Sequence, residues 1–304
     1  MSGVGVIVPV RAPAPFLDAA LDSALAQQPA PDRVVVVDDA SPEPVRLAER
    51  HRARCELVRR DQRGGPARAR ADAAERLGTP LLALLDADDR WLEGKLAAQI
   101  ALMADEPRAA LCFARAQVVG ADDRPTGETL PVPPAGLLEG DGLARLLFRG
   151  NPLPTSSVVA RRDAVEEAGG FAGGLDADRC EDWDLWLRMA RRGAAFAGEA
   201  MTHTLYRRHQ AGLTDEVAEV AEQALVLQER NADLVDEQTR HEGAADHLTL
   251  LARGRVRQRR YREAREALEA AAHHRPPPLR DRALALALTV PGLRAGLGRR
   301  PTYR

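Results

Sequence analysis

The sequence predicts an α/β protein with an open sheet, followed by an all-helical C-terminal region. Three short apolar runs, residues 4–10, 34–37 and 81–85, show little alternation of polar and apolar side chains. Such runs are typical of strands buried on both faces of a parallel sheet. Helical patterns separate the runs, which indicates a doubly wound sheet with helices on both sides. After residue 214 the pattern becomes helical, so we expect one domain over 1–214 and a helical region over 215–304.

Each element follows from local signals. Apolar residues at helical spacing predict a helix over 15–27, and Pro42 behind a Ser41 N-cap predicts a second helix. The same signals predict four more elements: a helix from Gly64-Gly65-Pro66 to about Gly78, a helix over 91–104, a strand over 155–160 and a helix over 182–192.

Composition excludes several classes of protein. The chain has 304 residues, 45% of them hydrophobic, which is enough for a substantial core. The first apolar run has no basic region before it and is interpreted as a strand, and residues 283–290 are too short to span a bilayer. Three scattered cysteines favour a reduced, cytoplasmic compartment. We expect no transmembrane segment.

The charge distribution does not point to nucleic acid. Residues 240–304 contain 15 Arg against 6 acidic residues, although the whole chain has a net charge of -2. Such a basic region could contact anionic lipid or an acidic polymer, but Lys95 is the only lysine, so the excess of arginine is interpreted as a bias of composition. We therefore expect no nucleic-acid partner.

Acidic residues follow two of the predicted strands. Asp38-Asp39 comes directly after 34–37, and Asp86-Ala87-Asp88-Asp89 directly after 81–85. Ligands of open α/β sheets bind outside the carboxyl ends of the strands, so five carboxylates are expected at one crevice. A bound divalent cation, Mg²⁺ or Mn²⁺, would relieve their repulsion. The alternative is that these aspartates only cap helices and make turns.

A second acidic cluster, Glu181-Asp182-Trp183-Asp184, opens the predicted helix that follows it. One of these carboxylates could act as a general base at the rim of the crevice. Acidic residues also stabilise helix N-termini through the helix dipole, and spacing alone does not separate the two interpretations.

Six segments taken together resemble the successive motifs of inverting family-2 glycosyltransferases, over roughly residues 4–214. The segments are VIVPV, VVVVDDAS, GGPARARADAA, LLALLDADDRW, GGF…EDWDLWLRMA and YRRHQAGLT. The resemblance implies a GT-A type fold, with a Rossmann-like open mixed sheet flanked by helices. It also implies metal-dependent transfer of a sugar from a nucleotide diphosphate sugar donor to an acceptor hydroxyl, with Mn²⁺ or Mg²⁺ as the cofactor.

The resemblance also assigns expected roles to individual residues. Pro9 would lie at the nucleobase, Asp38 and Asp39 would recognise the base or ribose, and Arg70 would lie on the nucleotide side. Asp86 and Asp88 would form the Asp-x-Asp motif at the ribose and the metal-bound diphosphate, with either Asp88 or Asp89 facing the ion. Asp182 would be the general base, and His209 would approach the diphosphate or the metal. Family members often carry Asn where this chain has Ala71, so no role is assigned through that position.

Two other functions compete with glycosyl transfer. A nucleotidyltransferase would share the fold style and the carboxylate-metal chemistry, but Arg11-Ala12-Pro13-Ala14-Pro15 replaces the Gly-rich phosphate loop expected after the first strand. A non-catalytic scaffold would use the helical region, in which Ala245 to Pro276 resembles one tetratricopeptide repeat. One repeat cannot form a solenoid, so we expect a helical hairpin, and a protein partner for it is left open.

Overall fold

The computed structural model describes residues 3–173, 179–208 and 217–289. The chain divides into two compact units. The first comprises Met1–Leu147 and Asn151–His209, and the second comprises Phe148–Gly150 and Gln210–Arg304. The domain boundary expected near residue 214 lies outside the described residues.

The first unit is built on one mixed, open sheet, with the strand order β3-β2-β1-β4-β9-β6-β10-β5 along its main path. β1, β2, β3 and β4 are parallel, whereas β9 is antiparallel to both β4 and β6. This architecture confirms the predicted open mixed sheet. The strands are β1 (Val4–Val10), β2 (Arg33–Asp38), β3 (Cys55–Arg59), β4 (Leu81–Leu84), β5 (Arg90–Trp91), β6 (Ala109–Val119), β7 (Pro125–Thr129), β8 (Gly136–Leu138), β9 (Val159–Arg161) and β10 (Ala195–Arg207).

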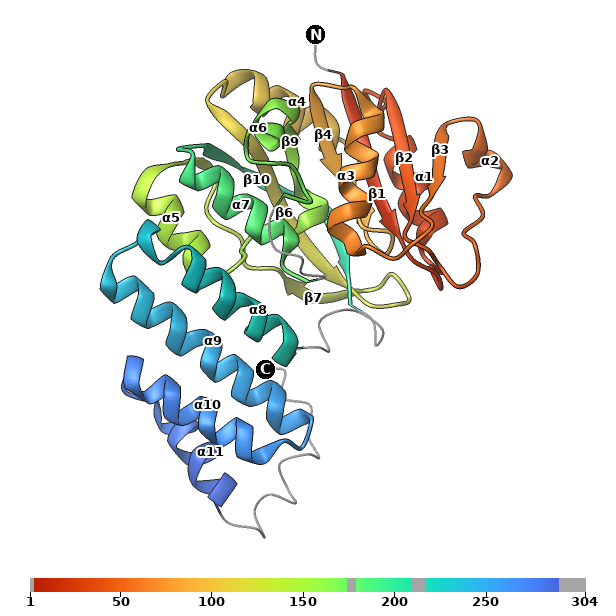
Figure 1. The fold of residues 1–304 in the computed structure, drawn as a ribbon. Helices are drawn as coiled ribbons and strands as arrows, with labels where there is room; N and C mark the ends of the chain where they lie inside the picture. The colour runs from red at the N-terminus through yellow and green to blue at the C-terminus, as the bar shows by residue number, and fades with distance from the viewer. Residues whose placement is uncertain (1–2, 174–178, 209–216, 290–304) are drawn as a thin grey trace. The chain divides into compact units, whose positions relative to one another are not determined.

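Helices cover both faces of this sheet, as Figure 1 shows, with α3 and α7 in contact on one face. Helices α1 and α4 contribute to the hydrophobic cluster on the other face, through residues such as Leu21 and Leu96. The helices of this part of the chain are α1 (Leu17–Leu25), α2 (Glu49–Arg52), α3 (Gly65–Leu77), α4 (Lys95–Asp105), α5 (Gly140–Arg149), α6 (Arg162–Glu167) and α7 (Glu181–Arg191), with a 3-10 turn at Thr155–Ser157.

The surroundings of strand β1 explain why its sequence does not alternate between polar and apolar residues. Val4 and Val6 belong to the cluster that contains α1 and α4, while the intervening residues face α3. At Gly5 the helix approaches so closely that an added Cβ would lie 2.6 Å from a methyl carbon of Leu77. Both faces of β1 are therefore buried, as the apolar run predicts.

Two predicted helices need correction. No helix begins at Pro42, because the Asp38 carboxylate accepts the backbone N–H groups of Ser41 and Val45 and so holds the segment as a loop. Helix α2 begins only at Glu49. The helix predicted over 91–104 begins at Lys95, because Trp91 belongs to β5 and pairs with Thr204 of β10.

The other local predictions hold with small shifts. Helix α3 ends at Leu77, and Gly78 follows with φ 63°, a left-handed conformation that glycine adopts without strain. The strand predicted over 155–160 is a 3-10 turn followed by β9. Strands β6 and β10 are the long elements that no sequence signal indicated.

The second unit is helical where it is described. It contains α8 (Val217–Arg230), a 3-10 turn (Ala232–Leu234), α9 (Glu237–Arg257), α10 (Tyr261–His274) and α11 (Leu279–Thr289). Helices α9 and α10 pack on each other around a small cluster that includes Ala252, Ala264 and Leu268. Among the helices in the described ranges, none is long and apolar enough to cross a membrane.

Candidate active site

The carboxylates after β2 are engaged by the protein's own donors. Asp38 is buried, accepts the N–H groups of Ser41 and Val45, and forms an ion pair with Arg59 at 2.5 Å. Burial acts to raise the pKa of Asp38, but the hydrogen bonds from Ser41, Val45 and Arg59 outweigh it and leave the pKa lowered. Asp38 therefore stays ionised and stabilises the conformation of the loop that follows β2.

Asp39 organises the start of α3. Its two carboxylate oxygens accept the backbone N–H groups of Gly64 and Gly65, each at 2.8 Å, and Arg60 lies 3.2 Å away. The carboxylate thus satisfies donors at the N-terminus of the helix. Pro9 lies beside Val37 in the register of β1 and β2, one residue before β1 ends. Pro9, Asp38 and Asp39 are therefore neighbours at the carboxyl ends of two adjacent strands.

Arg70 is the buried cation at the centre of the site. It is 3% exposed, and its guanidinium donates to Asp86 at 2.7 Å and to Glu181. Burial acts to lower the pKa of Arg70, but the carboxylates of Asp86, Glu181 and Asp182 together raise it. Arg70 therefore remains charged, and it joins α3, the end of β4 and the start of α7.

Glu181 shares this buried environment. Burial raises the pKa of Glu181 to about 7, although the neighbouring Arg70 opposes the shift. Asp184 is also buried and binds Arg188 at 2.7 Å within α7. The indole of Trp183 donates to the Leu147 carbonyl oxygen at 2.6 Å, so this ring packs in the interior and is not presented to a sugar.

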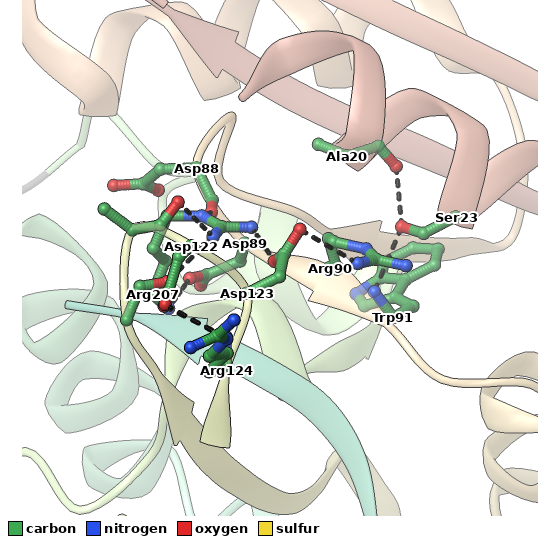
Figure 2. A network of polar contacts seen from close by, with 12 residues as sticks. Ala20, Ser23, Asp88, Asp89, Arg90, Trp91, Asp122, Asp123, Arg124 and Arg207 are labelled. Atoms are coloured by element: carbon green, nitrogen blue, oxygen red, sulfur yellow. Dashed lines mark hydrogen bonds and ion pairs between the residues drawn. The ribbon is translucent and has the colours of Figure 1, made fainter. Parts of the chain in front are cut away.

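The acidic turn after β4 is held in place by Arg207 of β10. Figure 2 shows Asp88, Asp89 and Arg207 together with Asp123 of the neighbouring turn. The Arg207 guanidinium donates to the Asp88 carbonyl oxygen at 2.8 Å and to the Asp123 carboxylate, and its backbone N–H donates to Asp89 at 2.8 Å. The same guanidinium lies over the ring of Phe16, 4.2 Å from its centroid.

Asp88 and Asp89 differ in exposure. Asp89 is 2% exposed, and burial together with the carboxylates of Asp88 and Asp86 raises its pKa well above the usual value. Asp88 is only partly buried. Asp86 forms an ion pair with Arg70, and its side chain is 30% exposed. Asp86 and Asp88 are therefore both partly accessible to solvent, whereas Asp89 is not.

Asp182 lies in the first turn of α7, and its carboxylate accepts three hydrogen bonds. Its Oδ2 accepts hydrogen bonds from Asn151 Nδ2 at 3.0 Å and from Thr155 Oγ1 at 2.5 Å, and its Oδ1 accepts the Trp183 N–H at 2.7 Å. The carboxylate is therefore oriented by two residues that precede it by 31 and 27 positions.

The residues of this site can also be examined as ligands for a divalent metal ion. Within the described ranges, no group of three or more His, Cys, Asp and Glu side chains is arranged to hold a metal ion. Mg²⁺ at nucleotide sites usually has one or two carboxylate ligands, with phosphate oxygens and waters completing its shell. The partly exposed Asp88 fits such a site. His209, the other expected ligand, lies outside the described residues.

Residues 5–168, more than half of the chain, match the model of the family described as glycosyl transferase family 2. The chain belongs to this family. It is therefore a glycosyltransferase, and the predicted resemblance is confirmed at the level of family and fold. No curated protein matches the sequence.

Solved structures of S. aureus TarS share the fold of this glycosyltransferase. TarS 1-349 in complex with UDP-GlcNAc has a TM-score of 0.62 at 16% identity, covering 97% of this chain and 88% of that one. The complex of the same fragment with UDP gives the same values. A longer TarS structure has a TM-score of 0.62 at 17% identity, covering 97% of this chain and 52% of that one.

The contacts of three residues of the glycosyltransferase site, Arg207, Thr155 and Ser156, were not predicted from the sequence, although residues 151–157 resemble the acceptor side of family members and Arg207 lies in the YRRHQAGLT segment. Arg207 contacts groups 84 to 119 positions away, and Thr155 and Ser156 lie in a short turn that could also be an ordinary loop entering a strand. No local pattern reveals such contacts, because they are made with partners on other elements.

Proposed function

We propose that this glycosyltransferase moves a sugar from a nucleoside diphosphate sugar to an acceptor hydroxyl with inversion at the anomeric carbon. The observation that carries the proposal is the arrangement around Arg70. This buried cation joins the acidic turn after β4, which would face the donor, to the start of α7, which carries Asp182. We also propose that residues 1–214 form the catalytic domain.

Asp182 would act as the general base. The acceptor oxygen forms a bond to the anomeric carbon while the bond from that carbon to the diphosphate oxygen breaks, and the hydroxyl proton passes to the Asp182 carboxylate. Oδ2 already accepts two hydrogen bonds, whereas Oδ1 accepts one. Each carboxylate oxygen has about two acceptor sites, so Oδ1 is the atom that would take the proton.

Asp88 would hold the divalent cation, Mn²⁺ or Mg²⁺, together with His209. When bound, such a cation stabilises negative charge on the departing diphosphate as a Lewis acid. Pro9, Asp38 and Asp39 would shape the nucleoside end of the site through the loops after β1 and β2. Arg70 would keep Asp86 in place beside the donor.

A donor screen tests this function. Purified protein is incubated with UDP-, GDP- and dTDP-sugars and Mn²⁺, and release of the nucleoside diphosphate is measured with water as acceptor. UDP-GlcNAc is the first candidate, since TarS was solved with it. We expect release from one nucleotide class, and no release from any of them would refute the proposal.

The base assignment has its own test. Asp182→Asn keeps the shape of the side chain but cannot take up the acceptor proton, so turnover should fall about 100-fold or more. Binding of the nucleoside diphosphate, measured by calorimetry, should remain near that of the wild type. A rate close to wild type at saturating donor would refute the role of Asp182.

A further inference from the structure

The 3-10 turn Thr155–Ser157 connects the two halves of the candidate site. The Thr155 hydroxyl donates to Asp182 Oδ2 at 2.5 Å. The neighbouring Ser156 Oγ accepts the backbone N–H of Asp86 at 3.0 Å. Two adjacent hydroxyls therefore contact the proposed base on one side and the start of the acidic turn, at Asp86, on the other.

Burial and hydrogen bonds from other elements hold the 3-10 turn in place. Ser156 and Ser157 are almost completely buried. The indole of Trp91 donates to the Ser156 carbonyl oxygen, and the Gln99 amide donates to the Ser157 carbonyl oxygen, each at 2.8 Å. Because Ser156 and Ser157 are buried and their carbonyl oxygens accept hydrogen bonds, the turn is a rigid support for the Thr155 and Ser156 hydroxyls.

We infer that Thr155 and Ser156 are positioning residues that hold the base and the donor-side turn at a set separation. This inference rests on the proposed function. An in-line displacement requires base and donor to be placed accurately, and small displacements reduce its rate strongly. Thr155 would act on transfer by occupying Oδ2 of Asp182, which leaves Oδ1 for the acceptor proton. Ser156 would act on donor binding by fixing the backbone of Asp86.

The two roles predict different kinetic effects. Thr155→Val keeps the size of the side chain but removes the hydroxyl. We expect kcat for donor hydrolysis to fall roughly 10- to 100-fold, the scale of one hydrogen bond to a charged group, while the Kd for the nucleoside diphosphate changes less than about twofold. Thr155→Ser restores the hydroxyl and should recover most of kcat. Ser156→Ala should instead weaken nucleotide binding, by roughly 10-fold, with a smaller effect on kcat.

Ser157→Ala is the matched control. Ser157 lies in the same turn and is equally buried, but its hydroxyl donates to the Pro154 carbonyl oxygen and contacts neither carboxylate segment. It should change both kcat and Kd less than about threefold. Asn151→Ala provides a second variant at the base in case Thr155→Val folds poorly. Asn151 is exposed and donates to the same Oδ2, so kcat should fall again with Kd unchanged.

The experiment measures release of the nucleoside diphosphate from UDP-GlcNAc, or from the donor that the screen selects, and calorimetric binding of the matching diphosphate. Near-ultraviolet circular dichroism checks folding of each variant. The inference is overturned if Thr155→Val behaves like Ser157→Ala, or if it weakens nucleotide binding as much as it lowers kcat. Full activity of Asp182→Asn would instead refute the proposed role of Asp182 as the base, and no release from any donor would refute the proposed function, so these failures are distinguishable.

Discussion

Removing the buried cation should destabilise the first unit strongly. Arg70→Met keeps much of the side-chain volume but leaves Glu181 and Asp86 without their shared partner. The Arg70 and Glu181 side chains are only 4% and 7% exposed, so solvent screens their interaction little. Breaking a buried ion pair by removing one partner costs about 3–5 kcal/mol. We expect a loss of about 3 kcal/mol at pH 7, because Glu181, with its pKa already raised to about 7, can take up a proton.

The assay is urea unfolding at pH 7, analysed by linear extrapolation. Arg33→Met is the matched control, because Arg33 pairs with Glu56 at 2.7 Å and both side chains are about a third to a half exposed. Such a surface pair contributes about 0–1 kcal/mol. Adding Glu181→Gln to Arg70→Met removes the uncompensated charge and should restore part of the loss. If Arg70→Met costs no more than Arg33→Met, the charge at the centre of the site does not stabilise the fold.

Three further predictions follow from individual contacts. Glu181→Gln should change the pH dependence of stability: the raised folded pKa of about 7, against 4.5, means that Glu181 stabilises the fold at low pH and loses this contribution as pH rises through 7. The unfolding free energy of Glu181→Gln minus that of the wild type should therefore become more favourable by up to about 3 kcal/mol as the pH rises from 4 to 8. A difference that does not change with pH would contradict the raised pKa of Glu181. Asp88→Ala should abolish the Mn²⁺-dependent part of UDP binding in calorimetry, whereas wild-type binding that is insensitive to chelator would argue against a metal at this residue. Gly254→Ala should cost about 1–3 kcal/mol, because the new Cβ would lie 2.6 Å from the Ala218 backbone nitrogen, while Gly142→Ala, with open space around it, should be neutral or stabilising by circular dichroism melting.

Local sequence patterns determined the first half of the fold. The apolar runs at β1, β2 and β4 are buried on both sides, so the strands were visible without knowledge of their neighbours. The acidic residues that end β2 and β4 could also be placed at one edge, because parallel strands of an open sheet present their carboxyl ends together. The ordered motifs then indicated the family.

Tertiary structure decided what each of these residues contacts. The sequence could not show that Asp38 would capture the backbone of the following loop and prevent a helix at Pro42, because propensity alone does not reveal a competing hydrogen-bond acceptor. Strands β6 and β10 were also missed, since β10 pairs with β6 and β8 across long sequence separations and includes a polar, partly exposed stretch.

The candidate site shows the same limit most clearly. Asp86 and Asp182 were found from their positions after a strand and at a helix start, which are local features. The contacts that they and their neighbours make were not predicted, because Arg70 reaches Glu181 across 111 residues and Thr155 reaches Asp182 across 27. Hydrophobic periodicity is set by neighbours along the chain, whereas the pairing of buried donors with carboxylates depends on how whole elements pack. The sequence therefore determined which chemical groups are available, and the packing of α3, α7 and the 155–157 turn determined which of them meet.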